Sequence, residues 1–298
     1  MVCNSSAPGA HTAAPAPPFP GGRPPRPVLP LQAWPLAERT RVRGVLTDID
    51  DTLTTEGRVT ADALQALARL REAGVPVFAV TGRPAGWSEA LLRTEPAVAL
   101  GAVVAENGGV ILIPRRLPDG TLQVGRSYWH DSPTRALHFA RLQAAAQRVL
   151  REVPGAKLAE DSPGRETDIA IDHSEFSHLS PTDIARVVAV LQDEGLQATV
   201  SSIHINGWLG EQNKRQAAHW VLREMLGLDL SQPEEQARWV YVGDSTNDQL
   251  LFEALPCTVG VANIARFMPA LTHRPRYVTQ AERGAGFAEL TQALLAAA

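Results

Sequence analysis

The chain has 298 residues, 44% of them hydrophobic and 20% charged, and its formal net charge is −4. This length suits one large domain or two ordinary ones, and the acidic balance gives no electrostatic case for binding nucleic acid or an anionic membrane. No apolar run approaches the roughly 20 residues that span a bilayer, and the amino terminus lacks the pattern of a secretory signal, so we expect a cytoplasmic protein without membrane or nucleic-acid partners.

Residues 1–40 are rich in proline, glycine and alanine. Such a segment cannot bury enough apolar surface to offset the entropy lost on ordering, so it predicts a disordered, Pro-rich tail. A docking segment for a proline-recognising partner is the alternative that this composition leaves open. For the assembly we expect a monomer or a small homo-oligomer.

After this tail, strand and helix signals alternate. A helix is expected over Ala61–Ala73, because Thr60 can cap its start and Gly74 can end it. The other elements of this stretch are apolar strands up to Leu46, over Val77–Val80 and over Ala99–Ala105, and a helix across Trp87–Arg93. The β-α-β-α-β order predicts a parallel sheet with right-handed crossovers.

The middle of the chain has a different pattern. Two helices are expected to open at Ser132-Pro133 and Ser180-Pro181, where a capping residue precedes proline at the first helical position. Short strands are expected over Lys157–Glu160, Thr167–Asp172, Ala198–Ser202 and Ile203–Trp208. Two helices with four strands fit a small α+β layer. We therefore predict an inserted domain over 113–206, within a core formed by 41–112 and 207–298.

Two carboxylates, Asp48 and Asp50, follow the first strand. Like charges about 4 Å apart cost roughly 4 kcal/mol at an effective dielectric constant near 20, so the segment favours a hard divalent cation. Asp48 is the candidate nucleophile that would form an aspartyl-phosphate, and Asp50 would act first as acid and then as base. Asp51 is given a solvated or loop-stabilising role. An Asp-rich turn is the structural alternative.

Two further segments offer groups for an anion. Thr81-Gly82-Arg83 directly follows an apolar strand, and a hydroxyl with successive backbone amides at such a turn forms an anion-binding concavity. Lys214 opens a predicted helix over 213–226, where the helix dipole disfavours a cation unless an anion is bound nearby. Taken alone, each segment also fits an ordinary turn or an exposed lysine.

A fourth segment, Gly243 to Asp248, follows another apolar strand. Asp244 could complete a metal site with Asp48 and the backbone carbonyl of Asp50. Asp248 could bind the metal through water or anchor the lysine. The alternative is a polar turn before the next helix.

In combination these segments resemble the haloacid dehalogenase (HAD) superfamily of phosphohydrolases. The DxDxT motif matches Asp48–Thr52, the threonine after a strand matches Thr81, the lysine matches Lys214, and the acidic GDxxND motif matches Asp244–Asp248. The cap inserted after the third strand is similar to the branch with large α/β caps (type IIB or Cof-like), which includes sucrose-phosphate phosphatases. The resemblance implies a Rossmann-like parallel-sheet core with an α+β cap, and Mg²⁺ held by Asp48, Asp50, Asp244 and Asp248.

Two positions depart from the usual pattern of these relatives. Asp51 stands where many have glycine, and Arg215 stands where glycine often follows the lysine. A bulky cation at this place could narrow the pocket or add a second anion contact, so it bears on the substrate more than on the reaction.

The predicted cap offers candidate contacts to a leaving group. His204 and Asn206 share one face of a predicted strand with Ser202, and a polar face suits a hydroxylated substrate such as a sugar. A polar edge that faces solvent is the alternative. Arg165 is a weaker candidate.

We therefore predict a Mg²⁺-dependent phosphatase that hydrolyses a small phosphorylated metabolite, with sugar phosphates first, through an aspartyl-phosphate. Its catalytic residues are Asp48, Asp50, Thr81 and Lys214, and its substrate-binding residues are Thr81, Gly82, Arg83, Lys214, His204 and Asn206. A phosphomannomutase-like phosphotransferase is the runner-up, although the cap has few basic residues. A non-catalytic phosphoester-binding protein is the third hypothesis.

Overall fold

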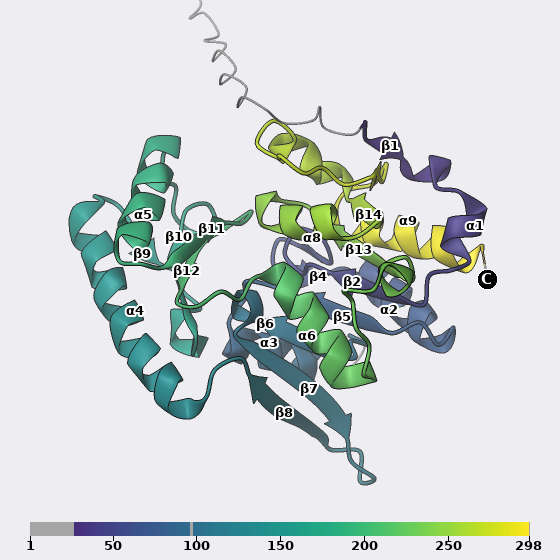
Figure 1. Cartoon of the computed structure of the whole chain (residues 1–298), viewed down its shortest axis with the longest axis horizontal. Coiled ribbons are helices and arrows are strands. Elements are labelled where there is room, and N and C mark those ends of the chain that lie inside the picture. Colours follow the sequence, from purple (N-terminus) through teal and green to yellow (C-terminus); the bar gives the residue numbers. More distant parts are fainter. Residues whose placement is uncertain (1–26, 96–97, 298) are drawn as a thin grey trace, which may run out of the picture.

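The computed structural model describes residues 27–95 and 98–297. Its larger part is a nine-stranded sheet in the order β1-β15-β14-β13-β2-β5-β6-β7-β8 (Figure 1). The strands of this sheet are β1 (Leu29–Pro30), β2 (Gly44–Thr47), β5 (Val77–Val80), β6 (Ala102–Ala105), β7 (Val110–Arg116), β8 (Leu122–Tyr128), β13 (Trp239–Gly243), β14 (Cys257–Gly260) and β15 (Tyr277–Val278). From β1 to β6 in this order all neighbours pair in parallel, and β7 and β8 add an antiparallel edge. The predicted α/β class is confirmed.

Helices cover both faces of this sheet, because successive residues of its central strands point to opposite sides. On one face α2 (Ala61–Glu72), α3 (Ala85–Thr94) and α9 (Arg283–Leu295) pack around Val45 and Ala79. On the other, α6 (Lys214–Leu226) and α8 (Gln249–Ala254) pack around Leu46 and Phe78. Burial on both sides explains the continuous apolar runs that the sequence shows in these strands.

The register of the central strands brings their carboxyl ends together. Val242 of β13 pairs with Thr47 of β2, and Thr47 pairs with Ala79 of β5. The residues that follow these strands therefore meet at one edge of the sheet, which is the usual ligand site of an open parallel sheet. This edge receives Asp48, Thr81 and Asp244.

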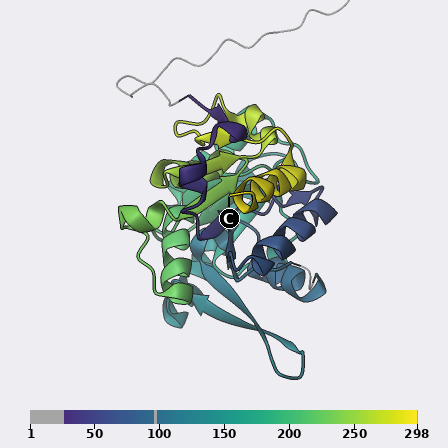
Figure 2. The same ribbon diagram turned by 90° about the vertical axis from the view of Figure 1, so that its right-hand side faces the viewer.

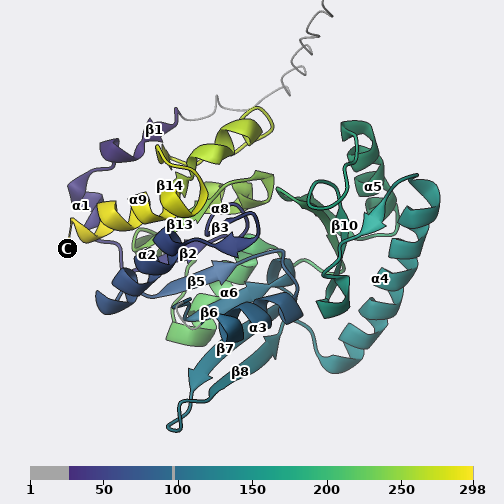
Figure 3. The ribbon, with the colours of Figure 1, turned by 180° about the vertical axis from the view of Figure 1, so that it is seen from behind.

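A four-stranded antiparallel sheet with two helices forms the cap beside this edge (Figure 3). Its strand order is β11-β12-β10-β9, and α4 and α5 cover the sheet face that points away from the core (Figure 1). The elements are α4 (Ser132–Glu152), β9 (Lys157–Leu158), β10 (Asp168–Asp172), α5 (Pro181–Asp193), β11 (Gln197–Val200) and β12 (His204–Trp208).

The predicted limits of the insertion, 113–206, need correction. β7 and β8 form a long hairpin that extends the core sheet (Figure 2), so the chain leaves this sheet only after Tyr128. At the other end, β12 keeps the chain in the cap sheet as far as Trp208. The hairpin is hard to recognise from sequence because β8 lies at an edge and alternates partly buried with exposed side chains.

The predicted disordered tail over 1–40 is also wrong in its last part, while residues 1–26 lie outside the described ranges. β1 pairs with β15, and Leu31 and Trp34 are buried in the core. Trp34 stacks on Tyr277 with 5.5 Å between the ring centroids. Two large apolar side chains anchor this segment, and a composition averaged over 40 residues conceals them.

Helix starts agree with the sequence signals at two of three places. The Thr60 side chain accepts a hydrogen bond from the backbone of Ala63 before α2, and Ser180 caps α5 as predicted. Before α4 the capping residue is Asp131 and not Ser132, because the Asp131 carboxylate accepts from the Thr134 backbone at 2.9 Å.

The remaining elements are η1 (Leu31–Ala33), α1 (Leu36–Arg39), β3 (Thr54–Thr55), β4 (Arg58–Val59), η2 (Glu106–Gly108), η3 (Ser162–Gly164), α7 (Pro233–Gln236), η4 (Thr246–Asp248) and η5 (Ala262–Phe267). No helix within 27–95 or 98–297 is both long and apolar enough to cross a bilayer.

Candidate active site

Asp48 is the first residue after β2, and its backbone N–H still donates to Val242 of the neighbouring strand at 2.9 Å. The residue is only 4% exposed. Its Oδ1 accepts from the Ile49 backbone at 2.8 Å and lies 3.1 Å from the Lys214 ammonium. Burial raises the pKa of Asp48 to about 7 even though the Lys214 cation lowers it. A second cation here would favour the ionised, nucleophilic carboxylate.

Lys214 is buried at the start of α6 and is not the exposed lysine of the structural alternative. Its Nζ lies 2.7 Å from Asp248 Oδ1, and Asn213 caps the helix by accepting from the backbone of Arg215 and Gln216. Burial would lower the pKa of Lys214, but the charges of Asp248 and Asp48 outweigh this effect, and the pKa is raised. The lysine therefore stays charged, and Asp248 anchors it as predicted.

Three carboxylates form a cluster that fits a hard cation. Asp48, Asp244 and Asp248 each bring one oxygen within 4.8 Å of the others. Asp244 Oδ1 is buried without a hydrogen-bond partner in the described residues, while its Oδ2 accepts from Asn263 at 3.1 Å. Burial raises the pKa of Asp244 well above its ordinary value. An oxygen-rich cluster with an unpartnered acceptor suits Mg²⁺. The carboxylate of Asp50 lies outside this cluster, so its backbone carbonyl stays the predicted ligand.

The loop after β13 is shaped by Asp248. One carboxylate oxygen accepts from the backbone N–H groups of Asp244 and Ser245 at 2.8 and 2.9 Å, and the other accepts from the Tyr241 hydroxyl. A Cβ at Gly243 would collide with this carboxylate. The Asp248 carboxylate approaches the backbone so closely that only glycine fits at this strand end, which explains the glycine in the GD pair of the motif.

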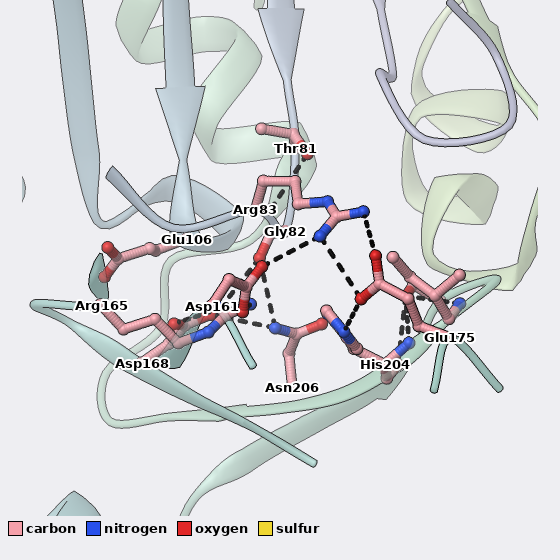
Figure 4. Close-up of polar contacts among 12 residues, drawn as sticks. Thr81, Gly82, Arg83, Glu106, Asp161, Arg165, Asp168, Glu175, His204 and Asn206 are labelled. Carbon is pink, nitrogen blue, oxygen red and sulfur yellow. Dashed lines mark hydrogen bonds and ion pairs between the residues drawn. The ribbon is translucent and has the colours of Figure 1, made fainter. Parts of the chain in front are cut away.

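Thr81 and Gly82 follow β5 and lie against the cap. The buried Thr81 hydroxyl accepts from the Arg83 backbone at 3.0 Å. The carbonyl of Gly82 accepts from Arg165 at 3.0 Å and from Asn206 at 3.3 Å, both of them cap residues (Figure 4). Arg165, a weak candidate from sequence, is therefore a direct contact between the cap and the predicted phosphate loop.

Arg83 joins the core to the cap through three carboxylates. Its Nε donates to both oxygens of Asp50 at 2.9 and 3.1 Å. Its Nη1 lies 3.1 Å from Asp161 and its Nη2 lies 2.8 Å from Glu175, both in the cap (Figure 4). The guanidinium also lies over the ring of Trp87. The predicted role of Arg83 in substrate binding is untested, and the structure adds a role in docking the cap.

His204 and Asn206 are buried at the interface between cap and core, so a polar edge facing solvent is ruled out for this face of β12. The His204 Nε2 lies 2.8 Å from Glu175, and the Asn206 amide donates to Asp168 at 3.2 Å. Both side chains already bond to protein groups. That either one also contacts a substrate stays a prediction.

Glu106 connects the core to the cap, a role that the sequence did not reveal. Its buried carboxylate accepts from the Ala85 backbone at 2.9 Å, and from the cap it accepts the backbone N–H of Glu166 at 3.1 Å and the Thr167 hydroxyl at 2.6 Å. The residue lies in a turn directly after β6, in which Glu106 and Asn107 have left-handed φ values of 52° and 54°. The local sequence does not show whether a carboxylate in a turn accepts hydrogen bonds from another domain or faces solvent. Asp161 and Glu175 escaped prediction for the same reason.

The structure shows the surroundings of Arg215 and Asp51, the two residues that depart from the pattern of the resemblance. Arg215 is exposed and lines a separate small pocket with His219 and Leu230, so it does not narrow the site beside Lys214. Asp51 stabilises its loop, as predicted, through ion pairs with Arg266 at 2.7 Å and Arg283 at 3.1 Å.

Comparison with known proteins agrees with this geometry. Residues 45–118 match the haloacid dehalogenase-like hydrolase family. A phosphoglycolate phosphatase of Methanothermobacter thermautotrophicus is 29% identical over 255 residues, which cover 83% of this chain and 96% of that protein. The fold is similar to the sucrose-phosphatase of Synechocystis sp. PCC6803 (TM-score 0.58, 19% identity, 84% of this chain and 97% of that one). It is also similar to a HAD/COF-like hydrolase from Plasmodium vivax (TM-score 0.62, 15% identity, 88% and 99%). The chain is therefore similar to haloacid dehalogenase-like hydrolases in the sequence of residues 45–118 and in its fold.

Proposed function

We propose that the protein is a Mg²⁺-dependent phosphatase of a small phosphorylated metabolite, with sugar phosphates first. The observation that carries this proposal is the buried cluster of Asp48, Asp244 and Asp248 around Lys214, in which one carboxylate oxygen of Asp244 has no partner among the described residues. Carboxylates outnumber the lysine here, so a further cation bound among them would favour their ionised forms.

Each of these residues has a role in such a reaction. Asp48 forms a bond to phosphorus while the bond to the leaving oxygen breaks, and water then releases the phosphate. Asp50 donates a proton to the leaving oxygen and accepts one from that water. Lys214, Thr81 and the backbone after it hold the phosphate oxygens. Mg²⁺ held by the three carboxylates would offset the charge of the phosphate and the nucleophile.

A pocket of about 330 Å³ opens beside Asp50, between the core and the cap. Because this pocket lies next to the predicted proton donor, we assign it to the leaving group of the substrate. Its core wall includes Thr54 and Arg83, and its cap wall includes Ser174 and Phe176. This volume suits a leaving group of sugar size or smaller. The name of the Methanothermobacter relative makes phosphoglycolate the second substrate to test.

The test is hydrolysis by the purified protein across a panel of phosphate esters. The panel contains an aryl phosphate, several sugar phosphates, phosphoglycolate and a sugar bisphosphate, each assayed with Mg²⁺ and with EDTA. We expect Mg²⁺-dependent release of phosphate from the aryl ester and at least one metabolite. No release from any ester with Mg²⁺ would refute the proposal, and conversion of the bisphosphate to an isomer without release of phosphate would favour the phosphotransferase.

A further inference from the structure

The walls of the leaving-group pocket carry an excess of negative charge. Of the ten residues that line it, four have carboxylates and one has a cation. The carboxylates belong to Asp50, Asp51, Glu56 and Glu175, and the cation is Arg83. Asp51 is neutralised by its two arginine partners, so the excess comes from the other three acids.

Arg83 has little capacity left for an anionic ligand. A guanidinium has five N–H donors, and those of Arg83 point at both oxygens of Asp50, at Asp161 and at Glu175. Its side chain is only 5% exposed. One positive charge is thus shared by three carboxylates, and a substrate anion could reach it only by displacing one of them.

Glu175 holds the negative charge in place on the cap side of the pocket. His204 lies 2.8 Å from one of its oxygens and Arg83 lies 2.8 Å from the other. Burial would raise the pKa of Glu175, but the His204 hydrogen bond and the Arg83 charge outweigh it and hold it at about 2. The carboxylate is therefore ionised at neutral pH and fixed by two partners. Glu56, at the exposed tip of the β3–β4 hairpin, adds a second negative charge on the core side.

We propose that Glu175 makes this pocket select against anionic leaving groups, so that the substrate is a phosphate ester of a neutral polyol or of an amino alcohol. This inference rests on the proposed phosphatase function and narrows its substrate class. The phosphate end of the substrate meets Lys214 and the metal cluster, whereas a carboxylate or second phosphate at the other end would lie beside Asp50 and Glu175. Like charges across such a wall disfavour binding and transition state alike. The same repulsion disfavours the bisphosphate of a mutase reaction.

Three phosphate esters of nearly equal size test this charge selection. Hydroxyethyl phosphate has a neutral leaving group, phosphoglycolate a carboxylate and phosphoethanolamine an ammonium group. We expect kcat/KM of the wild-type protein for phosphoglycolate to be at least about tenfold below that for the hydroxyethyl ester, with phosphoethanolamine equal to it or above it. The difference should shrink at high salt. If an ester turns over too slowly, its inhibition constant against an aryl phosphate gives the same comparison.

The Glu175→Gln variant keeps the shape of the side chain and removes its charge. We expect the ratio of its kcat/KM for phosphoglycolate to its kcat/KM for hydroxyethyl phosphate to rise at least about threefold. The ratio of kcat/KM for phosphoethanolamine to that for hydroxyethyl phosphate should fall. Asp193→Asn is the matched control, because Asp193 is an exposed cap carboxylate paired with Arg148, and it should leave both ratios unchanged. Glu56→Gln should shift the ratios in the same direction by less.

Two results would overturn this inference. One is a wild-type preference for phosphoglycolate over hydroxyethyl phosphate, which would mean that Arg83 exchanges a protein carboxylate for that of the substrate. The other is an unchanged ratio in Glu175→Gln. Either result would leave phosphatase activity itself established, whereas no hydrolysis of these three esters or of any ester of the wider panel would refute the proposed function and the selectivity with it.

Discussion

The cluster of Asp48, Asp244 and Asp248 and the interface between cap and core are both rich in buried carboxylates, but they balance this charge differently. In the cluster, Asp48 and Asp248 share Lys214, and Asp244 pairs with Arg266 at 3.4 Å but keeps an oxygen without a partner in the described part of the chain. At the interface, the carboxylates of Glu106 and Glu175 each accept hydrogen bonds from the other domain. The cluster thus has a free acceptor for a ligand, whereas Glu106 and Glu175 are bonded by the protein itself. We therefore expect the cluster to bind a ligand and these two glutamates to hold the cap against the core.

The largest expected effect is on the nucleophile. Asp48→Asn keeps the shape of the side chain but cannot form an acyl phosphate, so we expect kcat for an aryl phosphate to fall at least about 10³-fold. Because the change removes a buried carboxylate from a crowded cluster, the melting temperature of the metal-free protein should not fall. A loss smaller than tenfold in the variant would show that the attack on phosphorus comes from another group.

The second prediction concerns Asp244, a proposed Mg²⁺ ligand of the cluster. We expect Mg²⁺ at about 100 times its Kd to stabilise the wild-type protein by about 2.7 kcal/mol, seen as a rise in melting temperature. Asp244→Asn should abolish most of this rise and should itself stabilise the metal-free protein, because it removes like-charge repulsion. An equal response to Mg²⁺ in the variant and the wild type would place the cation elsewhere. The control Asp193→Asn should respond as the wild type does.

Asp48 of the cluster and Glu175 of the interface should contribute to the pH dependence of stability in opposite directions. The folded-state pKa of Asp48 is raised from 3.8 to about 7, so the metal-free folded protein binds more protons than the unfolded chain in this window. Its free energy of unfolding should therefore fall as the pH rises from about 4 to about 7. The pKa of Glu175 is lowered from 4.5 to about 2 by His204 and Arg83 against its burial. Its contribution is present above pH 4.5 and is lost as the pH falls toward 2.

Urea unfolding in EDTA across this range measures both slopes. Asp48→Asn should make the curve less steep between pH 4 and 7, where Asp168 and Asp244 also contribute because their pKa values are raised, and Glu175→Gln should make it less steep below 4.5. If each variant changed the other window instead, the assignment of the two regions would be reversed.

The smallest effect is expected at Arg215. Because this side chain is exposed and lines a pocket away from the site, Arg215→Ala should change kcat/KM less than about twofold for aryl and sugar phosphates. A tenfold change would restore Arg215 as a substrate contact.

The grouping of Asp48, Asp244 and Lys214 could be predicted from sequence because each of its parts is local. An apolar strand followed by a carboxylate, or a capped helix that opens with lysine, is visible within a few residues, and the parallel sheet brings these ends together. The interface could not be predicted, because Arg83 meets partners 78 and 92 residues away, in loops of the cap. No spacing rule relates these positions.

The errors in the fold lie at the two ends of the large sheet, where the apolar signal is weak. In β8 partly buried side chains stand among exposed ones, and in the segment around Trp34 the buried Leu31 and Trp34 stand in a proline-rich sequence. Thr60 and Ser180, by contrast, act within a single helical turn, and their capping was predicted correctly.

The most direct test of the aspartyl-phosphate chemistry is to find where the phosphoryl group is attached during turnover. The wild-type protein is mixed with an aryl phosphate and Mg²⁺, quenched in acid within the first turnovers, digested and examined by mass spectrometry. We expect one phosphoryl group on the peptide that contains Asp48, sensitive to hydroxylamine and absent in Asp48→Asn. A phosphoryl group on any other residue, or rapid turnover without a trapped intermediate in repeated early quenches, would contradict the role of Asp48.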